Sequence, residues 1–249
     1  MPLAPGQKVF VGFKHMHALP TPISSLRLIA SAERTSQDLE RTPIVQQLAE
    51  RMHIEPLHYD DLNGPAEQVR GLPIIQLGAD ASVAPALALL ERGARQVLAL
   101  TNSEPRIERM LIHVEPSSFG RDAVLSAVAS LARHLPIDVG MLVRDEEDSH
   151  AGGSYRDLLD LREISLRVHG LDIRTETFRG KATEAVRERL VTSDEQTLLV
   201  IGLTAPERCS DLIDELQRLL KETPPAAVLF VSGRDEAKEQ TAKSYAFSL

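Results

Sequence analysis

The chain has 249 residues, of which 43% are hydrophobic and 26% are charged, and this balance supports a folded core and excludes a disordered chain. Its 28 Lys and Arg against 36 Asp and Glu give a formal net charge of −8 without any basic stripe, so we expect no nucleic-acid partner. No run approaches the ~20 apolar residues of a membrane span, and the first residues lack the pattern of a secretory signal, so we expect a cytoplasmic protein without a membrane partner.

The first part of the chain predicts strands and helices in an order that is irregular at its start. We expect strands at 8–14, 27–32, 53–59, 73–77 and 96–100, and helices at 44–52, 65–70 and 83–90. The segment Pro20-Thr21-Pro22 stands where a helix between the first two strands would lie. We therefore expect that helix to be reduced or deleted.

The second part predicts a regular alternation of strands and helices. We expect strands at 110–114, 137–143, 172–178, 197–202 and 227–231, and helices at 122–135, 155–169, 182–191 and 210–222. Strands that alternate with helices of this length are typical of βαβ units and of a mainly parallel sheet.

These patterns predict an α/β protein built as a tandem of two doubly wound, mainly parallel sheets. The unit made of Leu77-Gly78, a helix and a strand at 97–100 matches the unit made of Ile201-Gly202, a helix and a strand at 228–231. We infer a degenerate internal repeat, with a shortened domain at 1–104, a complete domain at 105–234 and a mobile tail at 235–249.

The second domain resembles the universal stress protein family in the order of its five strands and four helices. In that family the first strand ends in Asp, and Glu115 stands at this position. The segment 225–231, Pro-Ala-Ala-Val-Leu-Phe-Val, resembles the family's final Pro-rich turn and strand. A response-regulator unit would need an Asp after its third strand, but Arg179 follows Phe178. The resemblance implies a nucleotide fold that forms dimers through edge strands.

The phosphate-binding glycines of that family are missing from this chain. In the family, the fourth strand ends in Gly, which is followed by two residues, Gly, nine residues and Gly-Ser or Gly-Thr. These glycines let backbone N–H groups approach a triphosphate. Counting from Gly202 places Ala205, Glu215 and Leu216 at the later positions. In the first domain, Ala81 and Glu91 follow Gly78 at the same spacing. We therefore expect no ATP binding by a glycine loop in either domain.

Residual nucleotide contacts remain an alternative. The resemblance implies that Glu115 would contact a ribose, and that backbone groups of Val143, Ile201 and Gly202 would contact an adenosine or AMP.

Other chemistry-bearing residues have less support. Cys209 precedes a helix, where a thiolate could be stabilised, but we interpret its role as structural or incidental. The histidines at 15, 17, 53 and 58 and the acidic segment 145–148 could bind a metal ion, yet no ligand spacing fixes such a site, so we expect no metal and no cofactor. No catalytic triad, Walker loop or dinucleotide fingerprint is present in the sequence.

The function predicted from the sequence is regulatory and non-catalytic, exerted through contacts with an unknown protein partner. We expect either a homodimer or an internal pseudo-dimer of the two domains, because unpaired strand edges drive association. Two alternatives stay open, a sensor that binds adenosine or AMP and a weak nucleotide hydrolase.

Overall fold

The computed structural model of the chain describes residues 23–31, 34–64, 70–102, 106–113, 121–135, 137–144, 170, 172–192, 196–203 and 210–232. In chain order its elements are β1 (Leu26–Ile29), α1 (Ser36–Glu40), α2 (Pro43–Met52), β2 (Leu57–Tyr59), β3 (Leu72–Gln76), α3 (Ala84–Glu91), β4 (Gln96–Leu100), β5 (Arg109–His113), α4 (Arg121–Ala132), β6 (Asp138–Arg144), β7 (Arg174–Phe178), α6 (Ala182–Thr192), β8 (Thr197–Leu203), α7 (Ser210–Glu222) and β9 (Ala227–Ser232). The strand predicted at 8–14, the helices predicted at 65–70 and 155–169 and the tail from 235 fall wholly or largely outside the described residues.

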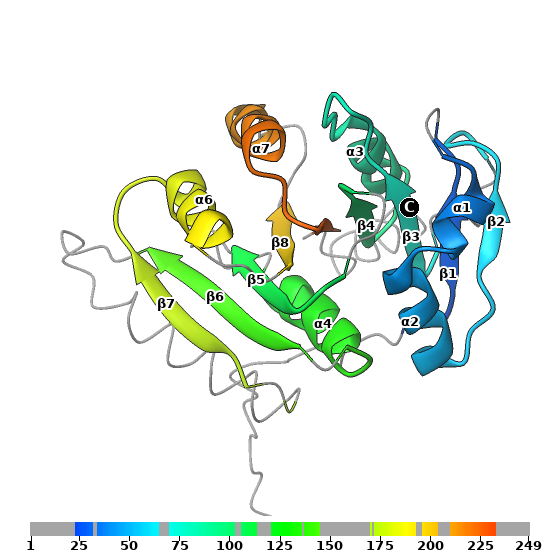
Figure 1. Cartoon of the computed structure of the whole chain (residues 1–249), viewed down its shortest axis with the longest axis horizontal. Coiled ribbons are helices and arrows are strands. Elements are labelled where there is room, and N and C mark those ends of the chain that lie inside the picture. The colour runs from blue at the N-terminus through cyan, green and yellow to red at the C-terminus, as the bar shows by residue number, and fades with distance from the viewer. Residues whose placement is uncertain are drawn as a thin grey trace, which may run out of the picture.

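The strands form one continuous sheet in the order β2-β1-β3-β4-β9-β8-β5-β6-β7. Every neighbouring pair is parallel except β4 and β9, which are antiparallel. The two expected sheets are therefore joined edge to edge into one, with β2 and β7 at its opposite ends (Figure 1).

The two sides of the antiparallel junction repeat the same strand order. Outward from the junction, β4, β3, β1 and β2 correspond to β9, β8, β5 and β6, and β7 has no counterpart among the described strands. The segments 92–95 and 223–226, which lead from a helix into β4 and β9, are also of equal length. The order in which strands follow outward from the junction is thus the same on both sides.

This correspondence changes how the first half is interpreted. The strand predicted at 27–32 is β1, and it corresponds to β5, the first strand of the complete half. Two helices, α1 and α2, follow it, so the connection after this strand is helical. The expected reduced helix, which was placed before this strand, lies outside the described residues.

Helices cover both faces of the sheet (Figure 1). One core lies under α1, α2 and α4 and includes Leu28, Ile74 and Val200, whereas the other lies under α3, α6 and α7 and includes Ile75, Ile201 and Phe230. Neighbouring positions of each strand face different cores because strand side chains alternate. Strands covered on both faces must be apolar throughout, as β3, β4, β8 and β9 largely are.

Helix α1 is too short to show an apolar period and was not predicted from the sequence. It begins with a capping box in which Thr35 Oγ1 accepts from the Asp38 backbone N–H at 3.2 Å and the Thr35 backbone N–H donates to Asp38 Oδ2 at 3.3 Å. The Thr35 hydroxyl also donates to Asp38 Oδ2 at 2.7 Å. These hydrogen bonds from Thr35 hold the pKa of the Asp38 carboxyl below its usual range.

The turn before β3 depends on one glycine. Gly71 has a φ of +75°, and a Cβ built on it would lie 2.5 Å from the backbone carbonyl oxygen of Ser25. That carbonyl accepts from the Leu72 backbone N–H at 2.9 Å, so the close approach is part of the pairing of β1 with β3. Only glycine meets both conditions.

Candidate functional site

The sequence-predicted site lies where parallel strands of the second half end. After β5 the chain passes to α4 on one face, and after β8 it passes to α7 on the other, so the crevice between β5 and β8 is a topological switch point, where open α/β sheets bind ligands. Ile201 pairs with His113 of β5, and Val143 lies one residue beyond Leu142, which also pairs with His113. The backbones of Val143, Ile201 and Gly202 therefore lie together at the carboxyl ends of the parallel strands. Glu115 lies outside the described residues.

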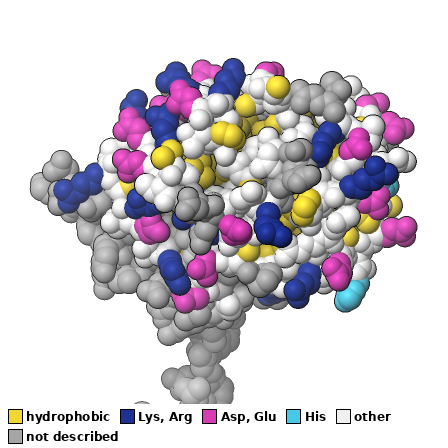
Figure 2. All heavy atoms as spheres, in the orientation of Figure 1, with side chains coloured by type: hydrophobic (Ala, Val, Ile, Leu, Met, Phe, Trp, Pro, Cys, Tyr) yellow, Lys and Arg dark blue, Asp and Glu magenta, His cyan; other side chains and the backbone are white. Residues whose placement is uncertain are grey.

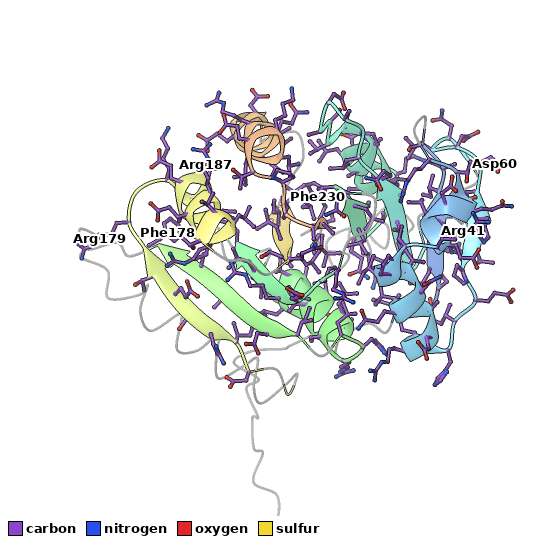
Figure 3. The ribbon with its side chains drawn as sticks, in the orientation of Figure 1. Arg41, Asp60, Phe178, Arg179, Arg187 and Phe230 are labelled. Atoms are coloured by element: carbon purple, nitrogen blue, oxygen red, sulfur yellow. The ribbon has the colours of Figure 1, made fainter. Side chains whose placement is uncertain are left out.

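The side chain of Ile201 belongs to the core and does not face a crevice. It is 4% exposed and lies in the cluster that also holds Phe230 of β9, under α3, α6 and α7. Figure 3 shows Phe230 near the middle of the sheet, far from Phe178 and Arg179 at the end of β7. The side chain of Ile201 is therefore not available to a ligand.

Gly202 is explained by helix packing. A Cβ built on it would lie 2.6 Å from Val124 Cγ2, a fully buried side chain on α4. The face of β8 beside Gly202 is therefore filled by α4, and any larger residue would push this helix away. Gly202 is the glycine of the family's pattern that this sequence keeps. It is needed for the packing of α4 against β8 whether or not a ligand binds.

The later positions of the missing glycine pattern serve packing as well. Glu215 lies inside α7, and its Oε2 accepts from the Thr183 hydroxyl of α6 at 3.1 Å. In the first half, Ala81 has a φ of +55°, in the left-handed region that favours glycine, and its methyl group lies in the core with Val83. Glu91 is the last residue of α3. The turn after β3 thus retains a backbone conformation typical of glycine but carries a side chain there.

The corresponding edge of the first half differs from the sequence expectation. In the repeat inferred from the sequence, Gly78 corresponds to Gly202. In the structure, however, Gly202 pairs with Val231 of β9, and Gln76 pairs with Leu100 of β4. If the central pair of the antiparallel ladder, Leu98 with Leu229, is taken as the centre of the repeat, Gln76 is the counterpart of Gly202.

Gln76 is a buried polar residue that the sequence reasoning missed. Its Nε2 donates to the carbonyl oxygens of Leu100 at 3.0 Å and of Leu77 at 3.4 Å. A single amide at the end of an otherwise apolar strand was the available signal in the sequence. The loop between β1 and α1 contributes Arg34 to the same edge of the sheet.

The described part of the chain shows neither a metal cluster nor a membrane span. Within it, no group of three or more His, Cys, Asp or Glu side chains could hold a metal ion. No helix described here is both long and apolar enough to cross a bilayer. On the face shown in Figure 2, acidic and basic side chains are interspersed.

Known proteins match this chain in fold, whereas the sequence alone matches none of the family models or curated proteins. Neither a protein-family model nor a curated protein matches the sequence. Among solved structures, a universal stress protein from Archaeoglobus fulgidus DSM 4304 is 10% identical at a TM-score of 0.57, and the match covers 86% of this chain and 98% of that one. A protein of unknown function from Pseudomonas aeruginosa PAO1 is 16% identical at a TM-score of 0.53, covering 89% and 98%.

A putative universal stress protein from Pseudomonas aeruginosa UCBPP-PA14 gives the same result, with 16% identity, a TM-score of 0.51 and a match that covers 84% of this chain and 93% of that one. These identities are too low to transfer a ligand or an activity, but the matches extend over both halves of the sheet. Together with the repeated strand order, they show that the chain has the universal stress protein fold.

Proposed function

We propose that this chain is a non-catalytic regulatory protein of the stress-response type, which acts through protein contacts and does not hold ATP with a glycine loop. The observation that carries the proposal is the contact between Val124 and Gly202, because it explains the remaining glycine without a ligand. The buried methyl group of Ala81 supports the same conclusion for the first half. A cytoplasmic location is part of the proposal.

The association of the two halves supports a role in protein contacts. Pairs from Gln96–Val231 to Leu100–Ala227 join β4 to β9, so two strand edges are satisfied within one chain. The Thr101 hydroxyl also donates to the Ala226 carbonyl oxygen at 3.0 Å at this junction. We propose that the junction is an internal pseudo-dimer interface.

A homodimer would have to use other surfaces. Among the described strands, only β2 and β7 keep an unpaired edge. Sedimentation equilibrium at micromolar concentration checks this point. A monomeric mass would leave the internal pseudo-dimer as the only association of the two halves, and a dimeric mass would place the contact at β2 or β7 or on a helical face.

A second candidate function is a sensor for adenosine or AMP. It is favoured by the position of the Val143, Ile201 and Gly202 backbones at one edge of the sheet. Adenosine and AMP carry no triphosphate, so their binding does not require the missing glycines. A weak nucleotide hydrolase is the remaining alternative, and it requires ATP to bind first.

One experiment separates these functions. The protein is purified without added nucleotide and denatured, and released adenine nucleotides are measured by mass spectrometry. A thermal-shift titration with ATP, ADP, AMP and adenosine follows, with tripolyphosphate at equal ionic strength as the control for charge alone. We expect no stoichiometric nucleotide and no shift with ATP beyond that of tripolyphosphate.

The other outcomes have definite meanings. Release of stoichiometric ATP, or a specific shift of the melting temperature with ATP, would refute the proposal and support the weak nucleotide hydrolase. A shift with AMP and adenosine but not with ATP would favour the sensor.

A further inference from the structure

Strand β7 forms one lateral edge of the sheet, opposite the edge formed by β2 (Figure 1). Its inner side carries the parallel ladder with β6, from Gly140–Arg174 to Arg144–Phe178. Within the described part of the chain, the backbones of residues 174–177 form no hydrogen bond outside this ladder. A row of unpaired N–H and C=O groups is a template for another strand. The outer side of β7 is therefore open to a strand from another chain.

The other free edge, β2, is less suited to such a contact. β2 has three residues and β7 has five, and a short edge strand is one of the means by which proteins limit edge-to-edge association. A contact between two β7 strands also closes, because the same edge serves in both copies. A contact between β2 and β7 would leave a free edge at each end and would repeat without closing.

The charges of β7 are complementary to those of a second β7 strand that runs antiparallel to it. Arg174 and Glu176 lie on the same face, because residues two apart in a strand share a face. If Thr175 of one copy lies opposite Thr175 of the other, each Arg174 lies opposite a Glu176, and such cross-strand pairs are stabilising. A register centred on Glu176 would place two carboxylates opposite each other. The charges therefore favour the register centred on Thr175.

The neighbours of these two side chains extend the same pattern. Arg174 Nη1 lies 3.7 Å from Asp138 Oδ2 of β6. Both side chains of this pair are about three-quarters exposed, at 77% and 75%, so the pair contributes little by itself and leaves the guanidinium able to contact a second carboxylate. On α6, Arg189 donates through Nε to Glu176 Oε2. A second copy would thus continue an alternation of anions and cations across the contact.

The opposite face of β7 also suits pairing with itself. Thr175 and Thr177 follow Ile173, a member of the core under α4, at strand spacing, and both threonines are exposed. Threonine favours strands, and two threonines opposite each other form a stabilising cross-strand pair. The chain already contains an association of this kind, because β4 and β9 join its two halves by antiparallel edge pairing.

We propose that β7 is an interface with a second copy of this chain, in which two β7 strands pair antiparallel with Thr175 at the two-fold axis. The two sheets then form one continuous sheet with a new antiparallel junction at its centre. The proposal deepens the role in protein contacts proposed above and rests on it for the class of partner. The nucleotide measurements test that function, whereas cross-linking tests this interface, so the two can fail separately.

Cysteine cross-linking tests the register. The background is Cys209→Ser, so that each variant carries a single cysteine. In the proposed register the Cα atoms of the two Thr175 residues are about 4.5–5.5 Å apart, a separation that a disulfide spans. The two Thr177 residues are offset by roughly 13 Å along the strands. Mild oxidation should give a covalent dimer with Thr175→Cys and not with the matched control Thr177→Cys, as measured by mass under non-reducing conditions.

Charge reversal tests the pairing of Arg174 with Glu176. Sedimentation equilibrium over a range of concentrations gives the dissociation constant of the dimer. It should rise about tenfold in Arg174→Glu or in Glu176→Arg, because each change places like charges opposite each other in two symmetric pairs. The variant that carries both changes restores opposite charges and should recover the wild-type constant. Arg51→Glu, at an exposed position of α2, makes the same change in net charge as Arg174→Glu and should leave the constant unaltered.

Four results would overturn the proposal. A wild type that is monomeric at every concentration would show that the charges of β7 protect its edge from association. Cross-linking of Thr177→Cys as readily as Thr175→Cys would exclude the proposed register. A dissociation constant that does not recover in the folded double variant would mean that Arg174 and Glu176 do not pair across the contact. A mass that keeps growing with concentration would indicate open assembly of β7 with β2. If Glu176→Arg fails to fold, Arg174→Glu and the two cysteine variants still decide.

Discussion

Replacing Gly202 by alanine tests whether α4, and not a ligand, keeps this position free of a side chain. The added Cβ would lie 2.6 Å from Val124 Cγ2, about 1 Å inside the usual contact distance of carbon atoms. Overpacking of this kind costs about 1–3 kcal/mol, whereas the lost freedom of the unfolded chain returns about 0.4–1 kcal/mol. We therefore expect Gly202→Ala to lower the free energy of unfolding by about 1–2 kcal/mol.

A double-mutant cycle attributes this loss to α4. Val124→Ala removes two methyl groups from a fully buried side chain and should cost about 1.5–3 kcal/mol by itself. In the double variant the methyl group of residue 202 occupies part of the vacated space, so its loss should be smaller than the sum of the single losses by about 1–2 kcal/mol. Urea denaturation followed by circular dichroism gives all four free energies.

Gly140→Ala is the matched control, because its Cβ would meet Leu111 Cδ1 at 3.6 Å, an ordinary contact. It should change the free energy of unfolding by less than Gly202→Ala does. If Gly202→Ala is as stable as the wild type, or if the cycle is additive within about 0.5 kcal/mol, the packing explanation of Gly202 is wrong.

Further predictions concern the turn before β3, the cap of α1 and the junction. Gly71→Ala should cost about 2–4 kcal/mol by urea denaturation, against about 1 kcal/mol for Gly93→Ala, which has a φ of +105° but open space around its Cβ; equal losses would contradict the role of the close approach. Thr35→Ala should raise the pKa of Asp38, measured by NMR titration of its carboxyl group, because hydrogen bonds from Thr35 lower it. The stabilisation from Asp38 is present above the usual carboxyl pKa and is lost as the pH falls through the lowered folded value, so this variant should show a weaker loss of stability in acid; an unchanged pKa would contradict the cap. Phe230→Ala, at a fully buried position of the junction, should cost about 3–5 kcal/mol and leave one transition for the whole sheet, whereas two separate transitions would show that the halves unfold independently.

Local pattern determined most of the elements. The helix predicted at 210–222 and the strand predicted at 96–100 have the bounds of α7 and β4. Both have a strong local signal, an apolar stripe at helical spacing in α7 and a run of strand length in β4. The helix α1 was missed because five residues are too few to show a period, although Thr35 and Asp38 carry its capping box.

The α/β class could be predicted from the sequence, because the alternation of strand-length and helix-length patterns depends on residues close together in the chain. The pairing of β4 with β9 into one sheet, and the position of Val124 beside Gly202, became visible only in the tertiary structure. These facts depend on contacts between segments far apart in the sequence. A local hydrophobic pattern states which face of an element is buried, but it does not state which distant element covers that face.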